Sequence, residues 1–184
     1  MTSFRLREAV RVLHHGGVVA YPTEAVYGLG CDPLRASAVQ RILEIKGRHP
    51  GKGLILIASE PAQLSPYLLL PDPQRLSRVQ ATWPGPHTWV FDANPDIPAW
   101  ITGGRNTVAA RVTAHPLAAA LCSAFGGALI STSANRTGGV PARSPLQARL
   151  VFGDDVDLYL HGACGRLARP TPVRDARTGD VLRA

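Results

Sequence analysis

The chain has 184 residues, of which 45% are apolar and 18% charged, and its formal net charge is +7 at pH 7. This length suits one globular domain that needs no disulfide or metal to fold, and no apolar run reaches the roughly 20 residues that span a bilayer. We expect a cytoplasmic protein, because the charged N-terminus lacks the apolar core of a signal peptide. The basic balance predicts an anionic partner: nucleic acid, nucleotide or an anionic surface.

The first part of the chain alternates helices with buried strands. Apolar residues recur at helical spacing in the first segment, which Gly16 and Gly17 end. Continuous apolar runs mark the two strands. The expected order is a helix over residues 4–15, a strand over 18–22, a loop over 23–33, a helix over 36–46 and a strand over 54–58. This succession of strand, helix, loop and strand indicates a βαβ-like unit.

The rest of the chain is less regular. A helix is expected to begin at Pro145, with Ser144 as its N-cap. The other expected elements are a helix over residues 72–83, strands over 87–92 and 107–112, a helix over 115–125, a strand over 128–131, and short strands over 157–160, 172–176 and 180–183. The sequence has no internal repeat and no low-complexity linker, so the pattern predicts one α/β domain with a single mixed sheet and helices around it.

Cysteine and histidine do not point to a metal site. The three cysteines, Cys31, Cys122 and Cys164, lie far apart and form neither a CxxC pair nor a disulfide framework. His14 and His15 are adjacent on a predicted helix and therefore point to different faces. We expect buried or inert thiols and no metal held by protein ligands alone.

The stretch KGRHPGKG, residues 46–53, holds both lysines of the chain and looks like a phosphate-binding glycine loop. A Walker A loop needs four residues between its glycines and a Ser or Thr after the lysine, but three separate Gly47 from Gly51 here and Gly53 follows Lys52. A dinucleotide fingerprint also fails, because this loop leaves a helix and enters a strand. Either a solvated glycine-rich turn or a phosphate-binding loop of another kind fits these residues.

Two further loops follow predicted strands and carry hydroxyl groups. YPTEAVYGLG, residues 21–30, places Thr23, Glu24 and Tyr27 where pocket residues commonly lie, although Thr23 could equally cap a local backbone group. LISTSANRTGG, residues 129–139, offers hydroxyls and backbone amides that can hold phosphate oxygens. The alternative for this second loop is a Ser/Thr turn that caps the next helix.

Arg111 stands on an otherwise apolar strand. In an extended strand, Thr107, Ala109 and Arg111 share one face. An arginine in this setting is either paired with another protein group or available as a fork for a carboxylate or phosphate.

In their order and spacing, these stretches together resemble the YrdC-like family, in particular its short TsaC-type threonylcarbamoyl-AMP synthases. The matching residues extend over nearly the whole chain and are YPTEAVYGLG, Lys46-x-Arg48 followed by GKGLILIA, ARV with His115-Pro116, and STSANRTGG. One departure is His49, since the family usually has proline directly after Lys-x-Arg. The resemblance implies a single YrdC-like domain over residues 1–184, with a twisted mixed α/β sheet and a basic concave face.

The resemblance also implies an activity. Family members condense L-threonine, bicarbonate or CO2, and ATP into threonylcarbamoyl-adenylate and pyrophosphate. Downstream proteins then transfer the threonylcarbamoyl group to an adenosine beside the anticodon of tRNA. ATP is thus a substrate, and Mg2+ is expected to arrive with it. The chemistry suits this residue inventory, because a carbamate oxygen that attacks the α-phosphorus needs aligned phosphates and a shielded carbamate but no protein nucleophile.

Roles follow from the resemblance position by position. Lys46 and Arg48 are expected to be catalytic, through contacts with the ATP phosphates and the departing pyrophosphate. The residues expected at the nucleotide are Lys46, Arg48, Lys52, Thr107, Ser131, Ser133, Asn135, Arg143 and Arg183. Those expected at threonine are Thr23, Tyr27, Arg111 and Thr171, with Arg111 on the carboxylate.

Two other functions stay open at this point. A double-stranded RNA or tRNA-binding module would also use a basic concave face, and tRNA could contact that face of a synthase. An aromatic content of 6% offers little surface for base stacking, however. A carbamoyl-transfer domain is the third reading, because a related domain occurs in hydrogenase-maturation enzymes, but those are long chains with cysteine-rich segments.

Overall fold

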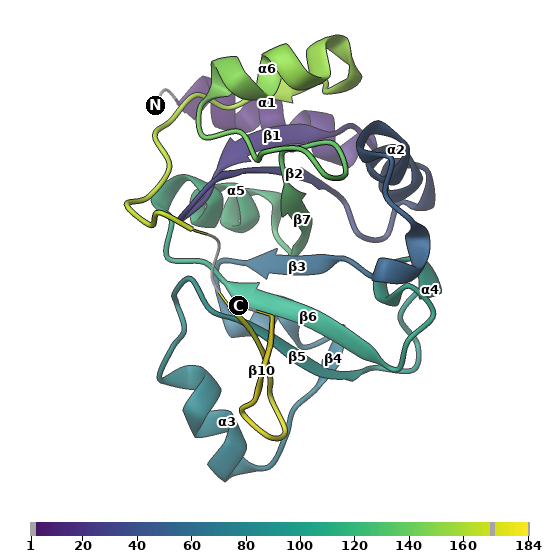
Figure 1. Ribbon diagram of the computed structural model, residues 1–184, viewed down its shortest axis with the longest axis vertical. Coiled ribbons are helices and arrows are strands. Elements are labelled where there is room, and N and C mark those ends of the chain that lie inside the picture. The colour runs from purple at the N-terminus through teal and green to yellow at the C-terminus, as the bar shows by residue number, and fades with distance from the viewer. Residues whose placement is uncertain (1–2, 170–171, 184) are drawn as a thin grey trace.

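The protein is described by a computed structural model over residues 3–169 and 172–183 (Figure 1). Its strands are β1 (Val19–Pro22), β2 (Tyr27–Cys31), β3 (Ile55–Ala58), β4 (Leu68–Leu69), β5 (Thr88–Ala93), β6 (Thr107–Val112), β7 (Leu129–Ser133), β8 (Leu158–Tyr159), β9 (Val173–Asp175) and β10 (Val181–Arg183). They form one sheet in the order β10-β9-β5-β6-β3-β7-β2-β1-β8, and β4 pairs with β5 outside this path. The pairs β1–β8, β3–β6 and β5–β9 are parallel and the others antiparallel, so the predicted mixed sheet is confirmed.

Helices flank the sheet along its length (Figure 1). They are α1 (Ser3–His14), α2 (Ala36–Lys46), α3 (Pro73–Gln80), α4 (Ala99–Thr102), α5 (Pro116–Phe125) and α6 (Pro145–Phe152). The expected cap of α6 is present, because the Ser144 hydroxyl accepts from the Gln147 amide at 3.1 Å. None of the described helices is long and apolar enough to cross a membrane.

The two faces of the sheet bury separate apolar clusters. On one face, α1 and α5 pack over Val19, Tyr21 and Leu129. On the other face, α2 and α6 belong to a larger cluster that includes Leu29 and Leu56. Alternate residues of each strand therefore point to opposite clusters, as the period of a strand requires.

One expectation was wrong: residues 23–33 are not a continuous loop, since Tyr27–Cys31 form β2. The glycines that suggested a loop make room inside the sheet instead. A Cβ on Gly30 would lie 2.7 Å from both the Ile130 carbonyl oxygen and the Tyr21 ring. Glycine in a strand commonly marks such a close approach. The short elements β4 and α4 had not been predicted, and the single-domain assignment over residues 1–184 stays a prediction.

Candidate active site

Two adjoining cavities lie on the sheet face that carries α1 and α5. The larger cavity has a volume of about 470 Å³ and the smaller about 230 Å³. Arg48, Leu54, Ile55 and Arg183 line both, so the two cavities form one continuous site. Ile57 lines the larger cavity and also packs in the cluster of α1 and α5. The site therefore lies next to α1 and α5, on the part of this sheet face that they leave uncovered.

Neighbouring strands supply the floor through their pairing register. Ile55 of β3 pairs with Ser131 of β7 and with Ala109 of β6, while Ile57 pairs with Arg111. All five residues line one of the two cavities. The expected shared face of Thr107, Ala109 and Arg111 agrees with this arrangement, since Thr107 lines the smaller cavity as well.

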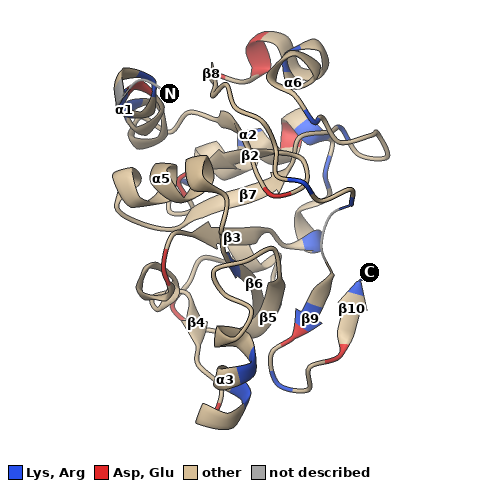
Figure 2. Ribbon diagram, turned by 90° about the vertical axis from the view of Figure 1, so that its left-hand side faces the viewer, with Lys and Arg blue, Asp and Glu red and all other residues tan. Residues whose placement is uncertain are grey.

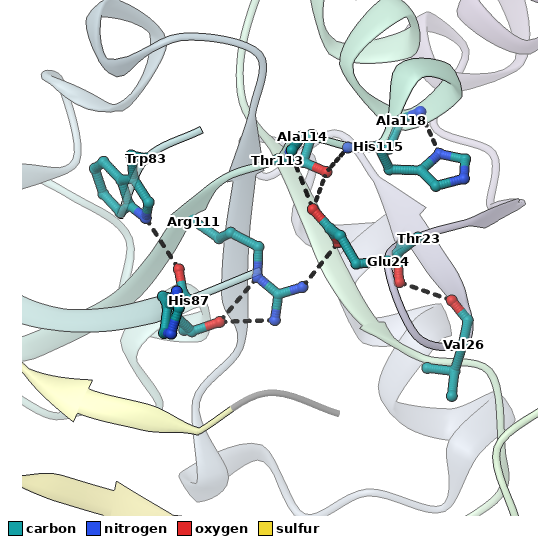
Figure 3. A network of polar contacts seen from close by, with 11 residues as sticks. Thr23, Glu24, Val26, Trp83, His87, Arg111, Thr113, Ala114, His115 and Ala118 are labelled. Atoms are coloured by element: carbon teal, nitrogen blue, oxygen red, sulfur yellow. Dashed lines mark hydrogen bonds and ion pairs between the residues drawn. The ribbon is translucent and has the colours of Figure 1, made fainter. Parts of the chain in front are cut away.

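The Arg111 guanidinium is oriented by two neighbouring side chains (Figure 3). Its Nε and one terminal nitrogen donate to the Thr88 hydroxyl at 3.0 and 2.8 Å, and the other terminal nitrogen lies 3.2 Å from the Glu24 carboxylate. Trp89 pairs with Ala110, so Thr88 and Arg111 are the next positions on adjacent strands. Burial lowers the pKa of Arg111, and the charge of Glu24 opposes that shift. The sequence left a paired or a ligand-binding arginine open, and the protein pairs it.

Glu24 is itself fully engaged. One carboxylate oxygen accepts from the Thr113 hydroxyl at 2.6 Å and from the Ala114 amide at 3.0 Å, and the other accepts from Arg111. Its side chain is 10% exposed. Glu24 therefore holds Arg111 in place, and both of its carboxylate oxygens accept hydrogen bonds from protein donors. Within residues 3–169 and 172–183, no group of three or more His, Cys, Asp or Glu could hold a metal ion.

Thr23 and Tyr27 both line the larger cavity. The Thr23 hydroxyl donates to the Val26 carbonyl at 2.7 Å, so it can offer a ligand only an acceptor. The Tyr27 hydroxyl donates to the Gly162 carbonyl at 2.6 Å, and the Leu160 carbonyl lies 3.1 Å from the same oxygen. Tyr27 thus ties residues 160–162 to the site, and its expected contact with threonine stays a prediction.

The loop after β7 is closed by its own side chains. Ser131 and Ser133 line the larger cavity, and the Ser133 hydroxyl donates to Asn135 Oδ1 at 2.6 Å. The Asn135 amide donates to the carbonyls of Arg136 and Gly139 at 2.8 and 3.0 Å. Asn135 is absent from the described residues that line either cavity. Of these two residues expected at the nucleotide, Ser133 therefore lines the cavity, whereas Asn135 shapes the loop.

Lys46, the last residue of α2, is buried, although side chains at the end of a helix are usually solvated. Its residue is 3% exposed, and its ammonium group donates to the Ser133 carbonyl and, at 2.6 Å, to the Asn135 carbonyl. Burial first, and the charge of Arg48 second, lower the pKa of Lys46 to about 8. Among described residues, neither cavity is lined by Lys46.

Arg48 is the cation at the centre of the site. One terminal nitrogen donates to the Gly53 carbonyl at 2.8 Å, whereas its buried Nε has no hydrogen-bond partner among described residues. Burial lowers the pKa of Arg48, and the nearby charges of Arg183 and Arg105 lower it further. Guanidinium groups that repel one another, together with a buried N–H that has no partner among described residues, favour the binding of an anionic ligand.

Other cations gather around the smaller cavity. Lys52, Arg105 and Arg183 line it together with Arg48, on the side of the molecule where β9 and β10 lie (Figure 2). Arg105 was missed in the sequence, although its position between Gly104 and a strand was a usable signal. The unusual His49 is accommodated locally, since its Nδ1 accepts from the Gly51 amide at 3.1 Å and caps the short turn Pro50–Lys52.

Two further residues were expected at the site, Arg143 and Thr171. Arg143 donates to the carbonyls of Leu167 and Ala168 at 3.1 and 2.9 Å, and it lines neither cavity among the residues described. It thereby tethers the segment that carries Arg169, a residue of the larger cavity that the sequence did not single out. Thr171 lies outside the described residues.

Comparison with known proteins identifies close relatives of the chain. A family model described as "Telomere recombination", which covers Sua5, YciO and YrdC, matches residues 11–184. A threonylcarbamoyl-AMP synthase of Halorhodospira halophila is 57% identical over 180 residues, which are 98% of this chain and 94% of that protein. The corresponding protein of Alkalilimnicola ehrlichii is 59% identical over 186 residues, which cover 98% and 96%.

Solved structures agree with these relatives. P. abyssi Sua5 complexed with L-threonine superposes with a TM-score of 0.90 at 31% identity, over 95% of this chain and 52% of that chain. E. coli YciO superposes with a TM-score of 0.85 at 30% identity, over 97% and 87%. HypF, at 15% identity and a TM-score of 0.79, shares the fold alone. The family resemblance and the expected YrdC-like fold with a mixed α/β sheet are confirmed, whereas the basic concave face stays a prediction; the chain belongs to the Sua5/YciO/YrdC family.

Proposed function

We propose that the chain is a threonylcarbamoyl-AMP synthase, which condenses L-threonine, bicarbonate or CO2, and ATP into threonylcarbamoyl-adenylate and pyrophosphate. The observation that carries this proposal is the continuous pair of cavities, in which an oriented arginine and a cluster of cations lie side by side. Relatives that are 50–59% identical over nearly the whole chain bear the name of this enzyme. A binding module for double-stranded RNA has no comparable support.

Threonine belongs in the larger cavity. Arg111 is oriented there to face a carboxylate, with Thr88 and Glu24 holding its guanidinium. The Thr23 hydroxyl, whose proton is committed to Val26, offers an acceptor for the N–H of threonine or of its carbamate. The Tyr27 ring forms part of the wall, and Thr171 stays an expectation from the family resemblance.

The ATP phosphates belong where the cavities meet. Arg48 and Arg183 line both cavities and would contact the phosphates directly, with Lys52 and Thr107 along the smaller cavity. Ser131 and Ser133 lie opposite them on β7. The other residues expected at the nucleotide already donate to protein carbonyls, and we propose that they hold the walls of the site; they are Lys46, Asn135 and Arg143.

This arrangement supports an in-line displacement without a protein nucleophile. The threonine amine combines with CO2 to form a carbamate and releases a proton, and a carbamate oxygen then attacks the α-phosphorus of ATP. The bond to the β,γ-phosphates breaks, and pyrophosphate leaves with the electron pair. Arg48 and Arg183 would stabilise the charge on the departing group, while the walls of the larger cavity would limit the access of water to the carbamate.

The wider setting is proposed on the family resemblance. Mg2+ enters as part of the ATP substrate and keeps several waters. The product passes to downstream proteins that transfer the threonylcarbamoyl group to tRNA, in the cytoplasm. Direct contact of tRNA with the basic face is a separate possibility, to be tested by RNA binding at increasing salt.

A pyrophosphate-release assay tests the function. We expect release from MgATP to require both threonine and bicarbonate, with threonylcarbamoyl-adenylate found by mass spectrometry. Release that is indifferent to threonine would overturn the proposal. RNA binding without any turnover would favour the binding module, whereas turnover with carbamoyl phosphate in place of threonine and bicarbonate would favour a carbamoyl-transfer domain.

A further inference from the structure

The segment with the Lys-x-Arg motif and the segment with the STSANRTGG motif are joined by hydrogen bonds. The end of α2 and the loop after β7 are connected through main-chain groups of three consecutive residues: Ile45 accepts from the Arg136 guanidinium at 2.9 Å, Lys46 from the Thr137 amide at 2.8 Å, and Gly47 from the Thr137 hydroxyl at 2.9 Å. The Lys46 ammonium adds its bonds to the carbonyls of Ser133 and Asn135. The two segments therefore cannot move independently.

A reversal of the chain at the end of α2 places Lys46 and Arg48 in different surroundings. Gly47 ends α2 in the left-handed region, with φ 58° and ψ 41°, and the amides of Gly47 and Arg48 return to the helix at 2.9 and 2.8 Å. After this reversal, Arg48 lines both cavities, whereas Lys46 is buried against the loop. The two cations of the Lys-x-Arg motif thus face different surroundings.

The loop after β7 holds its shape through bonds of its own and through Lys46. The Ser133 hydroxyl and the Asn135 amide satisfy one another and the carbonyls of Arg136 and Gly139. The carbonyls of Ser133 and Asn135 receive Lys46 instead. If the Lys46 side chain pointed outward to bind a phosphate, the Ser133 carbonyl would keep its bond from the Asn135 amide at 2.9 Å. The Asn135 carbonyl would lose the Lys46 donor at a partly buried position, which is unfavourable.

We infer that Lys46 is a positioning residue, which clamps the loop carrying Ser133 against the helix end that carries Arg48 and does not touch the nucleotide. This inference rests on the proposed function and changes the role of one of its residues. The clamp fixes the distance between two walls of the site, and a displacement of about 1 Å in such a wall can lower a rate a hundredfold.

The first experiment uses the two lysines of the chain as reporters, because Lys46 and Lys52 are the only ones. Brief acylation of the native protein, with peptide mass spectrometry, measures each lysine with and without MgATP. We expect exposed Lys52 to react and MgATP to protect it. Lys46 should react more than about tenfold more slowly in both conditions, since reaction requires local opening. Equal reactivity of Lys46, with protection by MgATP, would overturn the inference.

The second experiment separates positioning from phosphate contact. In Lys46→Met we expect kcat to fall by at least about tenfold, while inhibition by pyrophosphate stays within about twofold of the original. Hydrogen exchange at residues 133–137 should become faster. Lys46→Arg should fail to restore kcat, because a guanidinium does not fit the buried socket. Restoration of kcat by arginine, or a large loss of pyrophosphate affinity, would instead indicate direct contact.

A matched variant controls for charge. Lys52→Met removes the same charge from the smaller cavity and should weaken pyrophosphate inhibition without altering exchange at residues 133–137. If no pyrophosphate release is found in any variant, the proposed function fails, yet the acylation pattern still reports whether the clamp exists. The two failures are therefore distinguishable.

Discussion

At the scale of single residues, the orientation of Arg111 depends on Thr88, a buried residue that has no direct role in the proposed chemistry. Thr88→Val keeps the side-chain shape and removes the oxygen that accepts from two Arg111 nitrogens. We expect the KM for threonine to rise roughly tenfold or more, as for a lost hydrogen bond to a charged group, with the KM for ATP unchanged. Steady-state pyrophosphate release at varied threonine measures both.

Thr82→Val is the matched control. The Thr82 hydroxyl accepts from the Trp89 indole at 2.9 Å and donates to the Val79 carbonyl at 2.8 Å, away from Arg111. Thr82→Val should lower the melting temperature of the protein without changing the KM for threonine. An equal rise of this KM in both variants would mean that Thr88 acts through general stability.

Lys46 also makes stability depend on pH. Its pKa falls from 10.5 to about 8 on folding, so between these values the unfolded chain carries a proton that the folded chain has lost. Stability due to this residue therefore rises with pH through that range. We expect the free energy of unfolding in urea to increase more from pH 7.5 to 9.5 in the original chain than in Lys46→Met. An identical pH dependence in both proteins would show that the residue titrates normally.

At the scale of elements, β2 requires glycine at one central position. A Cβ on Gly30 would approach the Ile130 carbonyl and the Tyr21 ring within 2.7 Å. We expect Gly30→Ala to destabilise the fold by about 1–3 kcal/mol, the usual cost of overpacking, measured by urea unfolding. Gly127→Ala, where a Cβ would meet the Phe125 ring at an ordinary 3.7 Å, should change stability far less.

Most elements could be predicted from sequence because their signals are local. Apolar periodicity located α2 as Ala36–Lys46 and β6 as Thr107–Val112 at their observed bounds. β2 was misread because its two glycines look like loop residues, and only the approach of Tyr21 and the Ile130 carbonyl across the sheet explains Gly30. The site shows the same limit. Thr88 meets Arg111 through the pairing register of β5 and β6, which no local pattern specifies.

Lys46 shows the limit most directly. From the sequence it was a cation at the end of a helix, where side chains are usually solvated. The carbonyls that bury it come from Ser133 and Asn135, 87 and 89 positions later in the chain. Long-range packing of this kind decides whether a motif residue faces a ligand or the protein.

At the scale of the whole molecule, the cations form a field around the two cavities. Arg105 is exposed at the rim of the smaller cavity and adds to that field. The proposed chemistry assigns it no contact with a particular group of the substrates. We expect Arg105→Gln to raise the KM for ATP by a factor of about two to five at low salt and less at 0.5 M salt, because such charges are screened. The KM for threonine should stay the same.

Arg75→Gln provides the matched control for this charge. Arg75 lies on α3 and pairs with Asp72 at 3.1 Å, outside both cavities. Its removal changes the net charge equally and should leave the KM for ATP unchanged. A similar effect of both variants would mean that net charge, rather than the rim of the smaller cavity, governs ATP capture.

The position of β7 between β2 and β3 bears on how the protein is made. The two flanking strands leave the ribosome well before residues 129–133, and until β7 arrives each exposes an unpaired edge that invites pairing with other chains. The same late segment brings Ser131 and Ser133 to the cavity, and with the loop that follows it supplies the acceptors of Lys46. Closure of the sheet centre and completion of this wall of the site are thus one event, so a nascent chain should gain solubility and this wall of the pocket together.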